Sequence, residues 1–453
     1  MIVAVRTTAP VTEAVARYAR EYRFEGVSAE VFARAERAVI DTIGVAIAGG
    51  VEPCFSILAQ TLGHTGNDAS VLATGRKASA ADAAFLNGTS GHALDFDDVA
   101  DALKGHPSVV LVSALLAVAE ASERTGREFL EAYIVGFEIA CAIARTLPVE
   151  AHYRNGWHAT ATVGVLAAAA GAGRLLGLDH EQMRNALGIA ASMASGSRQN
   201  FGTMTKPLHA GLAARDAVIA AELASHGFTA DQEQLEGPVG YFRQYGLDSD
   251  LGAVQRSLAG GSVLLSDGVS VKKYPCCYGT HRAADAALML RARGVVAGEV
   301  RSVRAAVEPG GLQATIHHRP VTGLQGKFSN EYVIAACLLD GSVRLSTFTD
   351  AAVSRPEAQD LLQRVAIQEL ESPPFGDSGF QHAYATVDIE LVDGTVVRER
   401  CDVPRGDGRA PLSDAEIEAK FRDCLDFARS HWEAEGLLTH LRNLRSAPHV
   451  MRW

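Results

Sequence analysis

The order of apolar and polar positions divides the chain into a long helical part and a shorter mixed part. Through about residue 265, apolar side chains recur at the three- and four-residue spacing of helices that bury one face. The stretch from Ser108 to Ser122 is apolar almost throughout, which is typical of a helix at the centre of a bundle. Ser28 suits the start of a helix that Gly49 ends, because serine caps free amides and glycine accepts the conformation of a helix end. The predicted helices cover residues 29–48, 108–122, 127–145, 160–176, 180–194 and 208–226.

Alternating apolar and polar positions after about residue 265 indicate strands. Such alternation places every second side chain on the same face of a sheet. Asp393-Gly394 lies between two of these stretches and favours a tight hairpin turn. Because helices and strands are mixed here, this part predicts a smaller α+β domain. The predicted strands cover residues 303–308, 387–391 and 395–399, and the predicted helices cover residues 332–339 and 355–363.

The domain organisation follows from these patterns. A chain of 453 residues is too long for one ordinary core, so two domains are expected. We predict a mainly α fold, with a large all-helical domain over residues 1–265 and the smaller α+β domain over residues 266–399. Two more helices, at 413–429 and 432–442, lie in the segment 400–453, which we expect to return to the first domain.

Composition and net charge indicate which kinds of molecule the protein binds. The formal net charge is −11, whereas a nucleic-acid-binding protein needs a basic face. The longest apolar run, residues 159–176, contains Arg174 and predicts a buried helix rather than a membrane span. Seven cysteines without a C-x-x-C pair, and an N-terminus without a signal-peptide pattern, are typical of reduced thiols in the cytoplasm. We expect no nucleic-acid or membrane partner, and an acidic ligand would require cations that cluster in one pocket.

The first segment with candidate chemistry spans residues 92–108. Closely spaced acids repel one another unless cations offset them, so this density of carboxylates suggests a site. A solvated acidic loop is the alternative interpretation. The last histidine stands at the start of the apolar helix, where an imidazole would face a cleft. The segment carries two histidines and four acids: His92, Asp95, Asp97, Asp98, Asp101 and His106.

Asp97, Asp98 and Asp101 also form a D-D-x-x-D pattern. In an all-helical protein this spacing can bind magnesium and a diphosphate, as it does in terpene cyclases. Such an enzyme needs a second metal motif and an aromatic-lined cavity, but the sequence shows no second motif and only 6% aromatic residues. A magnesium-dependent enzyme of the terpene cyclase type is therefore a remote alternative, and we expect no metal.

Two further segments place a histidine or a lysine at the start of a predicted helix. His158 lies in Asn155-Gly-Trp-His, just before a helix whose free amides favour anions. Thr203 and Lys206 lie among small residues in the segment 202–211, and a lysine can bind a carboxylate as a point charge. A structural histidine and a surface lysine are the alternatives.

A fourth segment, residues 271–282, lies at the junction of the two predicted domains. It holds Lys272, Lys273 and His281 close together in sequence. Ligand sites favour such junctions, although a charged linker would have the same composition. The pair of adjacent lysines offers two candidates for one pocket position.

Taken together, these segments resemble the MmgE/PrpD family over nearly the whole chain. The resemblance implies a large helical domain with a smaller α+β lid domain, usually as a homodimer. Members of the family include 2-methylcitrate dehydratase, cis-aconitate decarboxylase and iminodisuccinate epimerase. The strings that carry the resemblance are HALDFDD, GHPS, NGWHAT, GTMTKPLHAG, KKYPCCYGTH and FSNEYVIAACLLDG, in that order.

The resemblance also implies positions for the pocket residues. The sequence K-K-Y-P leaves the choice between its two lysines open, and we favour the first. Val99 stands where the cis-aconitate decarboxylase pattern has a threonine. The expected catalytic residues are Asp95, His106, His158, Lys206, Lys272 and Tyr332. The expected substrate-binding residues are His92, Thr203, Lys273 and His281.

The implied activity is that of a cofactor-independent lyase acting on a small di- or tricarboxylic acid such as 2-methylcitrate or cis-aconitate. Lys206 and Lys272 would stabilise charge that develops next to a carboxylate, and His106, oriented by Asp95, would move the proton. Dehydration ranks slightly before decarboxylation, and an epimerase or racemase of an amino- or imino-dicarboxylate is the alternative. A non-catalytic binding protein is disfavoured, because unpaired buried charges are costly. His158 would bind a second carboxylate or act as the acid on the opposite face of the substrate, and Tyr332 would donate a hydrogen bond or relay a proton.

Overall fold

Capping residues set the starts of several helices in the larger domain. Ser28 accepts a hydrogen bond from the Glu30 amide at the start of α2 (Ala29–Ala48). Thr125 and Asp179 form reciprocal capping boxes at the starts of α6 (Gly126–Thr146) and α10 (His180–Met193). The predicted helix boundaries at these positions therefore agree with the structure to within about two residues.

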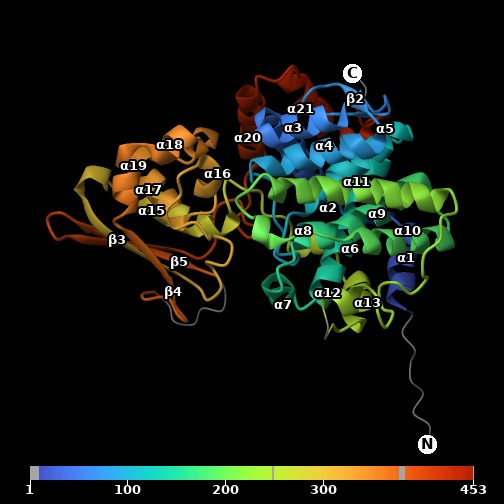
Figure 1. Ribbon diagram of the computed structural model, residues 1–453, viewed down its shortest axis with the longest axis horizontal. Coiled ribbons are helices and arrows are strands. Elements are labelled where there is room, and N and C mark those ends of the chain that lie inside the picture. The colour runs from blue at the N-terminus through green and yellow to red at the C-terminus, as the bar shows by residue number, and fades with distance from the viewer. Residues whose placement is uncertain (1–9, 247–248, 377–382, 452–453) are drawn as a thin grey trace, which may run out of the picture.

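The computed structural model describes residues 10–246, 249–376 and 383–451, and Figure 1 shows a helical domain with a smaller mixed domain beside it. Apolar α5 (Pro107–Ala121) is buried along nearly its whole length and packs against α4 (Ala80–Ala93), α9 (Gly164–Leu176) and α11 (Thr205–Ser225). The remaining helices of this part are α1 (Val11–Glu21), α3 (Pro53–Leu62), α7 (Val149–Arg154), α8 (Ala159–Thr162), α12 (Tyr241–Tyr245), α13 (Gly252–Leu258) and α14 (Val263–Ser266).

Two glycines allow α4 and α11 to approach each other closely. A Cβ atom added to Gly211 would lie 2.5 Å from the carbonyl oxygen of Phe85, and one added to Gly88 would lie 2.8 Å from the Cα atom of Gly211. Any larger residue would therefore force the two helices apart. This contact matters for the site because α4 leads into the first candidate segment and α11 begins next to Lys206.

The smaller domain is built on a four-stranded sheet in the order β4-β3-β5-β6. Its strands are β3 (Val300–Val307), β4 (Val365–Glu369), β5 (Ala385–Leu391) and β6 (Val396–Cys401). β3 is parallel to β4 and antiparallel to β5, and β5 and β6 form the predicted hairpin around Gly394. Helices α15 (His281–Ala292) and α17 (Asn330–Asp340) cover one face of the sheet (Figure 1). The shorter helices are α16 (Gly323–Gly326), α18 (Asp350–Ser354) and α19 (Pro356–Leu362).

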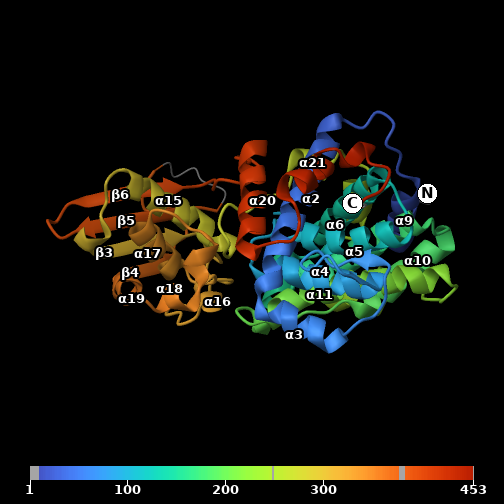
Figure 2. The ribbon, with the colours of Figure 1, turned by 90° about the horizontal axis from the view of Figure 1, so that it is seen from above.

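The C-terminal segment returns to the helical domain. α20 (Asp414–Ala428) packs along α2, where the ring of Phe421 lies against Gly44, and α21 (Ala434–Arg442) follows it. Figure 2 shows α20 standing where the two domains meet. A C-terminal helix thus reaches the same region as the candidate segments from the first half of the chain.

One sequence-based prediction of local structure is wrong, and one strand of the smaller domain was not predicted. The helix predicted over residues 160–176 is broken at Val163, which separates α8 from α9. Strand β4 was not predicted, because only its first residue is buried and the other four are half-buried or exposed, which leaves little alternation to detect.

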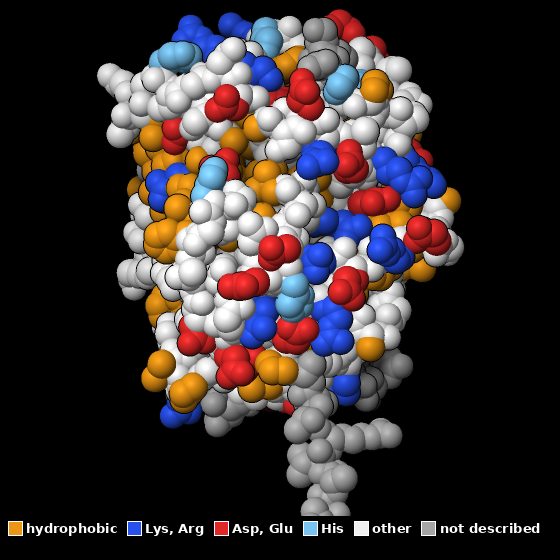
Figure 3. All heavy atoms as spheres, turned by 90° about the vertical axis from the view of Figure 1, so that its right-hand side faces the viewer, with side chains coloured by type: hydrophobic (Ala, Val, Ile, Leu, Met, Phe, Trp, Pro, Cys, Tyr) orange, Lys and Arg blue, Asp and Glu red, His pale blue; other side chains and the backbone are white. Residues whose placement is uncertain are grey.

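The stretch Ala159–Leu176 is long and apolar enough to count as a candidate membrane span, yet 89% of its residues are buried inside the helical domain. A core helix passes the same test of length and composition. On the face opposite the smaller domain, acidic and basic side chains lie next to one another, with hydrophobic side chains between them (Figure 3).

Candidate functional site

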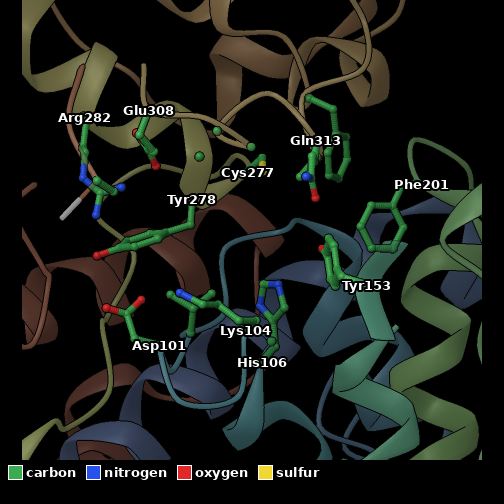
Figure 4. A pocket seen from close by; sticks show the side chains of 18 of the residues that line it. Asp101, Lys104, His106, Tyr153, Phe201, Cys277, Tyr278, Arg282, Glu308 and Gln313 are labelled. Atoms are coloured by element: carbon green, nitrogen blue, oxygen red, sulfur yellow. The ribbon is translucent and has the colours of Figure 1, made fainter. Parts of the chain in front are cut away.

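A cavity of about 760 Å³ lies between the helical domain and the smaller domain, which is called the lid domain below. Figure 4 shows side chains from both domains facing this cavity. Lys104 and His106 rise from the segment that precedes α5, whereas Arg282, Glu308 and Gln313 come from the lid domain. The segments that the sequence analysis singled out therefore meet at a domain junction, where ligand sites are common.

Asp95 is the centre of a buried charge cluster at this cavity. It follows the end of α4 and adopts a φ angle of 52°, a left-handed conformation that costs a residue other than glycine roughly 1–2 kcal/mol. Its carboxylate pairs with Lys206, from the first turn of α11, and its Oδ2 atom lies 2.9 Å from the Nζ atom of Lys272. Burial by itself would raise the pKa of Asp95, but the two ammonium groups hold it well below the usual value. Asp95 is therefore ionised, and its carboxylate raises the pKa of Lys272, which stays protonated.

A second cluster joins two histidines to Asp97. The Nδ1 atom of His92 lies 2.8 Å from the carboxylate of Asp97, and that of His106 lies 3.1 Å from the same oxygen. Burial lowers the pKa of His92 to about 3, and burial also lowers that of His106, although Asp97 opposes both shifts. Near neutral pH both rings are therefore neutral. If each ring donates its Nδ1 proton to Asp97, its Nε2 atom is left as a base.

His158 forms the remaining part of the site on the helical domain. It stands just before α8, and its Nδ1 atom lies 3.2 Å from Nδ1 of His209 on α11. Burial and the neighbouring His92 and Lys206 hold the pKa of His158 well below its usual value. The ring of Phe201 packs against it at a centroid distance of 5.0 Å. A neutral imidazole is therefore held rigidly beside the two lysines.

Comparison with known proteins assigns the fold to a family. The family model of the MmgE/PrpD N-terminal domain matches residues 13–253, and that of the C-terminal domain matches residues 274–443. The chain belongs to the MmgE/PrpD family. The resemblance in the sequence motifs is thereby confirmed, as is the mainly α fold with its smaller α+β domain.

Curated relatives of this MmgE/PrpD chain are similar to it over nearly their whole length. Cis-aconitate decarboxylase of Homo sapiens is 31% identical over 446 residues, which cover 96% of this chain and 92% of that protein. The Mus musculus enzyme of the same name is 30% identical, over 91% of this chain and 86% of that protein. The Aspergillus terreus enzyme is 27% identical, over 91% and 88%. The chain is thus a carbon–oxygen or carbon–carbon lyase of the MmgE/PrpD type.

The structure settles which of the two adjacent lysines faces the cavity. Lys272 is 1% exposed and donates to both the carbonyl and the carboxylate of Asp95. Lys273 is exposed, and its ammonium lies 5.5 Å from the centroid of the Tyr274 ring, away from the residues that line the cavity. Our preference for Lys272 agrees with this placement, whereas the expected substrate contact from Lys273 does not.

Three other expected pocket residues lie outside the cavity lining. The hydroxyl of Tyr332 donates to the carbonyl of Thr347 at 2.6 Å, inside the core of the lid domain. Thr203 is exposed and donates to the carbonyl of Asn200, so it stabilises the turn before α11. His281 is buried between the rings of two tyrosines, where burial lowers its pKa to about 3. The resemblance to the family placed these residues at the pocket, but a sequence motif does not show which way each side chain points. His92 also lies behind the cavity wall, where it contacts Asp97 and His106.

The D-D-x-x-D alternative is contradicted by the directions of its carboxylates. Asp97 faces the histidines, while Asp98 accepts hydrogen bonds from the amide and the hydroxyl of Ser108. Burial raises the pKa of Asp98 to about 8, so this group is protonated near neutral pH. Asp101 is exposed at the mouth of the cavity. The three groups do not converge on one point, as a magnesium–diphosphate site would require.

His92, Asp97 and His106 form the one cluster among the described residues that brings three potential metal ligands together. One donor atom from each lies within 4.8 Å of the others. The Nδ1 atom of His92 forms a hydrogen bond with Asp97 at 2.8 Å, and the Nδ1 atom of His106 lies 3.1 Å from the same carboxylate oxygen. Contacts between imidazole and carboxylate therefore account for the cluster.

Several residues that line the cavity were not predicted. Tyr153, Phe201 and Phe328 form its apolar part, and Arg282 and Gln313 extend it on the lid side. Tyr153 lies in the short helix α7 and Arg282 in the first turn of α15, whereas the other three lie in loops and turns. Their position at the cavity depends on how the two domains pack. A sequence pattern contains no signal for such a contact, except that Phe328 begins one motif string of the family and Arg282 directly follows another.

Proposed function

We propose that this protein removes carbon dioxide from cis-aconitate, or from a closely similar unsaturated tricarboxylic acid, using only its own side chains. The relatives named cis-aconitate decarboxylase support the substrate class. The observation that carries the proposal is the pair of buried ammonium groups, Lys206 and Lys272, which meet at Asp95 beside His106. Such a pair suits a reaction in which negative charge grows next to a carboxylate.

The charge balance of the site favours an anion. Lys206, Lys272 and Lys327 bring three positive charges to this region, and the ionised carboxylates of Asp95 and Asp97 offset two of them. A carboxylate of the substrate that enters the cavity meets the remaining charge in surroundings from which water is largely excluded. Coulomb attraction is stronger there than in bulk water. The whole chain has a net charge of −11, so this local excess of positive charge would guide the substrate to the site.

The reaction breaks one carbon–carbon bond and forms one carbon–hydrogen bond. Cleavage of the bond to the carboxylate on the saturated carbon releases carbon dioxide and leaves its electron pair on an allylic carbanion. The pair moves to the far end of the alkene, next to another carboxylate, which Lys206 and Lys272 stabilise. One preorganised donor of this kind contributes about 3 kcal/mol to the transition state. A proton then adds at that far carbon, and a terminal alkene results.

His106 is positioned to deliver this proton. Asp97 holds its Nδ1 side, so the Nε2 side is available to the cavity. Burial and the nearby lysines lower the pKa of His106, but an anionic substrate opposes the effect of the lysines and favours the protonated ring. Asp97 would then stabilise the imidazolium. His158, on the neighbouring wall, would contact a second carboxylate.

The same groups would also support dehydration of a hydroxy acid or epimerisation of an amino-dicarboxylate, because each passes through a similar carbanion. Because these relatives are named cis-aconitate decarboxylases, we rank decarboxylation before dehydration, which reverses the order that we drew from the sequence motifs. Val99, where the motif pattern has threonine, lines the cavity and is held by backbone hydrogen bonds to Ser270. Because valine and threonine have nearly the same shape, this difference removes a hydroxyl group from the cavity lining and leaves its titratable groups unchanged.

The test is turnover of a panel of acids by the purified protein in the presence of a metal chelator, followed by proton NMR. The panel contains cis-aconitate, citrate, 2-methylcitrate and one enantiomer of an amino-dicarboxylate. We expect a terminal alkene from cis-aconitate. An alkene formed from citrate or 2-methylcitrate alone would instead assign a dehydratase, and inversion of the amino acid would assign an epimerase.

We also propose, from the family resemblance, that the protein is a homodimer, and from its cysteine usage that it is cytoplasmic. Light scattering should give about twice the chain mass of 47.9 kDa at micromolar concentration. A mass equal to that of one chain at the concentration used for activity would contradict the dimer.

A further inference from the structure

Three consecutive carbonyl groups beside the site are each bound by a different buried lysine. The carbonyl oxygen of Leu94 accepts from Lys327 at 2.6 Å, and that of Phe96 accepts from Lys420 at 2.8 Å. Between them, the carbonyl of Asp95 accepts from Lys272 at 2.7 Å. We call the three lysines and the segment that they bind, Leu94–Phe96, the lysine clamp.

The lysines of the clamp come from three distant parts of the chain. Lys327 follows α16 in the lid domain, Lys272 lies in the crossing between the domains, and Lys420 lies on α20 near the C-terminus. None of the three is more than 8% exposed. Of these three, only Lys272 was expected at the site from the sequence, although Lys327 directly precedes the family string that begins at Phe328. Lys420 lies in a helix with many charged residues, where one lysine does not stand out.

Each of the two unassigned lysines also holds a second group. Lys327 donates to the carbonyl of Pro275 at 3.0 Å. Lys420 donates to the carbonyl of Lys272 at 2.9 Å, and its Nζ atom lies 2.7 Å from Oδ1 of buried Asp41. Both lysines therefore tie the Leu94–Phe96 segment to the stretch that carries Lys272. Hydrogen bonds from a charged donor are shorter and stronger than those between neutral groups.

The clamp surrounds Asp95, which is one of two cavity residues other than glycine with a left-handed backbone; the other is Lys104, with a φ angle of 49°. Asp95 has a φ angle of 52°, and a residue other than glycine keeps such a conformation only when its surroundings impose it. The carbonyls on both sides of this residue are fixed by Lys327 and Lys420. The carboxylate that receives Lys206 and Lys272 is thereby held in one place.

We propose that Lys327 and Lys420 are positioning residues for the reaction of this site, with Lys327 as the contact through which the lid domain sets the geometry of Asp95. This inference rests on the proposed function for its kinetic part. Lys420 belongs to a helix that packs on α2, so it fixes the segment from the helical domain itself. Lys327 reaches across from the lid domain, and its neighbour Phe328 lines the cavity. Docking of the lid domain thus brings a cavity wall and a support for Asp95 into place together.

Burial of an ammonium group on carbonyl oxygens is unfavourable unless the hydrogen bonds compensate for lost hydration. Burial lowers the pKa of Lys327 to about 8, although the carboxylates of Asp95 and Glu52 raise it. Methionine has a similar length and would fill the same space without either hydrogen bond. The Lys327→Met change therefore removes the clamp contact and keeps the packing.

The experiment compares the wild-type protein with Lys327→Met, Lys327→Arg and, as a matched control, Lys273→Met, whose ammonium is exposed. On cis-aconitate we expect Lys327→Met to lower kcat about 10- to 100-fold, with a much smaller change in KM. Arginine can donate to the carbonyls of both Leu94 and Pro275, so Lys327→Arg should recover part of the loss. Lys273→Met should retain the wild-type kcat.

Amide hydrogen exchange over residues 94–106 gives a reading that is independent of turnover. The amide of Val99 donates to Ser270, and that of Ala100 donates to Gly105, both at 3.0 Å, so these amides exchange slowly when the segment is held. Faster exchange in Lys327→Met than in Lys273→Met would support the clamp. If Lys327→Met keeps both the amide exchange rates and the kcat of the wild-type protein, the proposed clamp is wrong, whatever the melting temperature of the variant.

The two proposals fail in different ways. If the wild-type protein converts none of the acids in the panel, the proposed function is wrong, and the exchange data alone decide whether Lys327 holds the segment. If the wild-type protein is active and Lys327→Met is too unstable to measure, the kcat and the amide exchange of Lys327→Arg are measured in its place. If the amides of Lys327→Arg exchange at the wild-type rate while its activity is lost completely, Lys327 is not a positioning residue.

Discussion

At the scale of single residues, burial decides the charge of each group at the site. Burial by itself would raise the pKa values of the carboxyl groups of Asp95 and Asp97. The lysines next to Asp95 and the histidines next to Asp97 outweigh this effect and hold both pKa values well below the usual range. Asp98, one residue along the chain, has only neutral hydrogen-bond partners among its near contacts, and its pKa rises to about 8. Near neutral pH, Asp97 is therefore ionised, whereas the adjacent Asp98 is protonated and neutral.

Asp98 should make the stability of the protein fall as the pH rises. Between its ordinary pKa of 3.8 and its folded value of about 8, the folded state binds one more proton than the unfolded state. The free energy of unfolding therefore decreases with pH, by up to about 1.4 kcal/mol per pH unit from this group. Asp98→Asn mimics the protonated form and should gain stability relative to wild type between pH 5 and pH 8, as measured by urea unfolding. If the free energy of unfolding changed with pH in the same way for both proteins, Asp98 would not have the raised pKa.

His106 is the residue on which proton transfer depends in this account. We expect His106→Ala to lower kcat about 10²–10⁴-fold, because a positioned acid or base contributes that much. The exposed His64 provides the matched control, and His64→Ala should keep the wild-type rate. Circular dichroism would show that both variants fold. A His106→Ala protein that folds and keeps most of its activity would assign the proton to another group.

At the scale of elements, the sequence predicted the helices well where apolar spacing and caps agree. The helix predicted at 108–122 is α5, at Pro107–Ala121, and the Asp393-Gly394 hairpin joins β5 to β6. The sequence did not predict the break in the helix at Val163 or the strand β4, because tertiary contacts rather than the local apolar pattern determine the structure there. Of the site, the order of the motifs predicted Asp95, His106, His158, Lys206 and Lys272. The direction of Tyr332, Thr203 and His281 depends on packing inside the lid domain or on a local turn, which spacing does not encode.

The contact between α4 and α11 gives a direct test of this packing. Gly211→Ala would place its Cβ atom 2.5 Å from the carbonyl oxygen of Phe85, so the helices must separate. Overpacking of this kind typically lowers the free energy of unfolding by about 1–3 kcal/mol. The control is Gly261→Ala, whose Cβ atom would have no neighbour within 4 Å, and its effect should stay within about 0.5 kcal/mol. Equal urea midpoints for the two variants would contradict the close approach.

At the scale of the whole molecule, the acidic chain gathers four buried lysines around one segment. Lys206, Lys272, Lys327 and Lys420 come from both domains and from the C-terminal helix, and all contact residues 94–96. A net charge of −11 therefore coexists with a local excess of positive charge at the site. Composition predicted that cations cluster at the site, but it did not show which lysines do so. Packing of the lid domain on the helical domain brings Lys327 to this cluster, and packing of α20 on α2 brings Lys420.

The most direct test of the central claim is turnover of cis-aconitate in deuterium oxide by the wild-type protein and by Lys272→Met and Lys273→Met. The account predicts a methylenesuccinate product with one deuterium in its saturated methylene group. It also predicts a loss of about 10²-fold or more in kcat for Lys272→Met and none for Lys273→Met. A product without deuterium at that carbon, or equal rates in the two variants, would contradict a carbanion stabilised by the buried lysine.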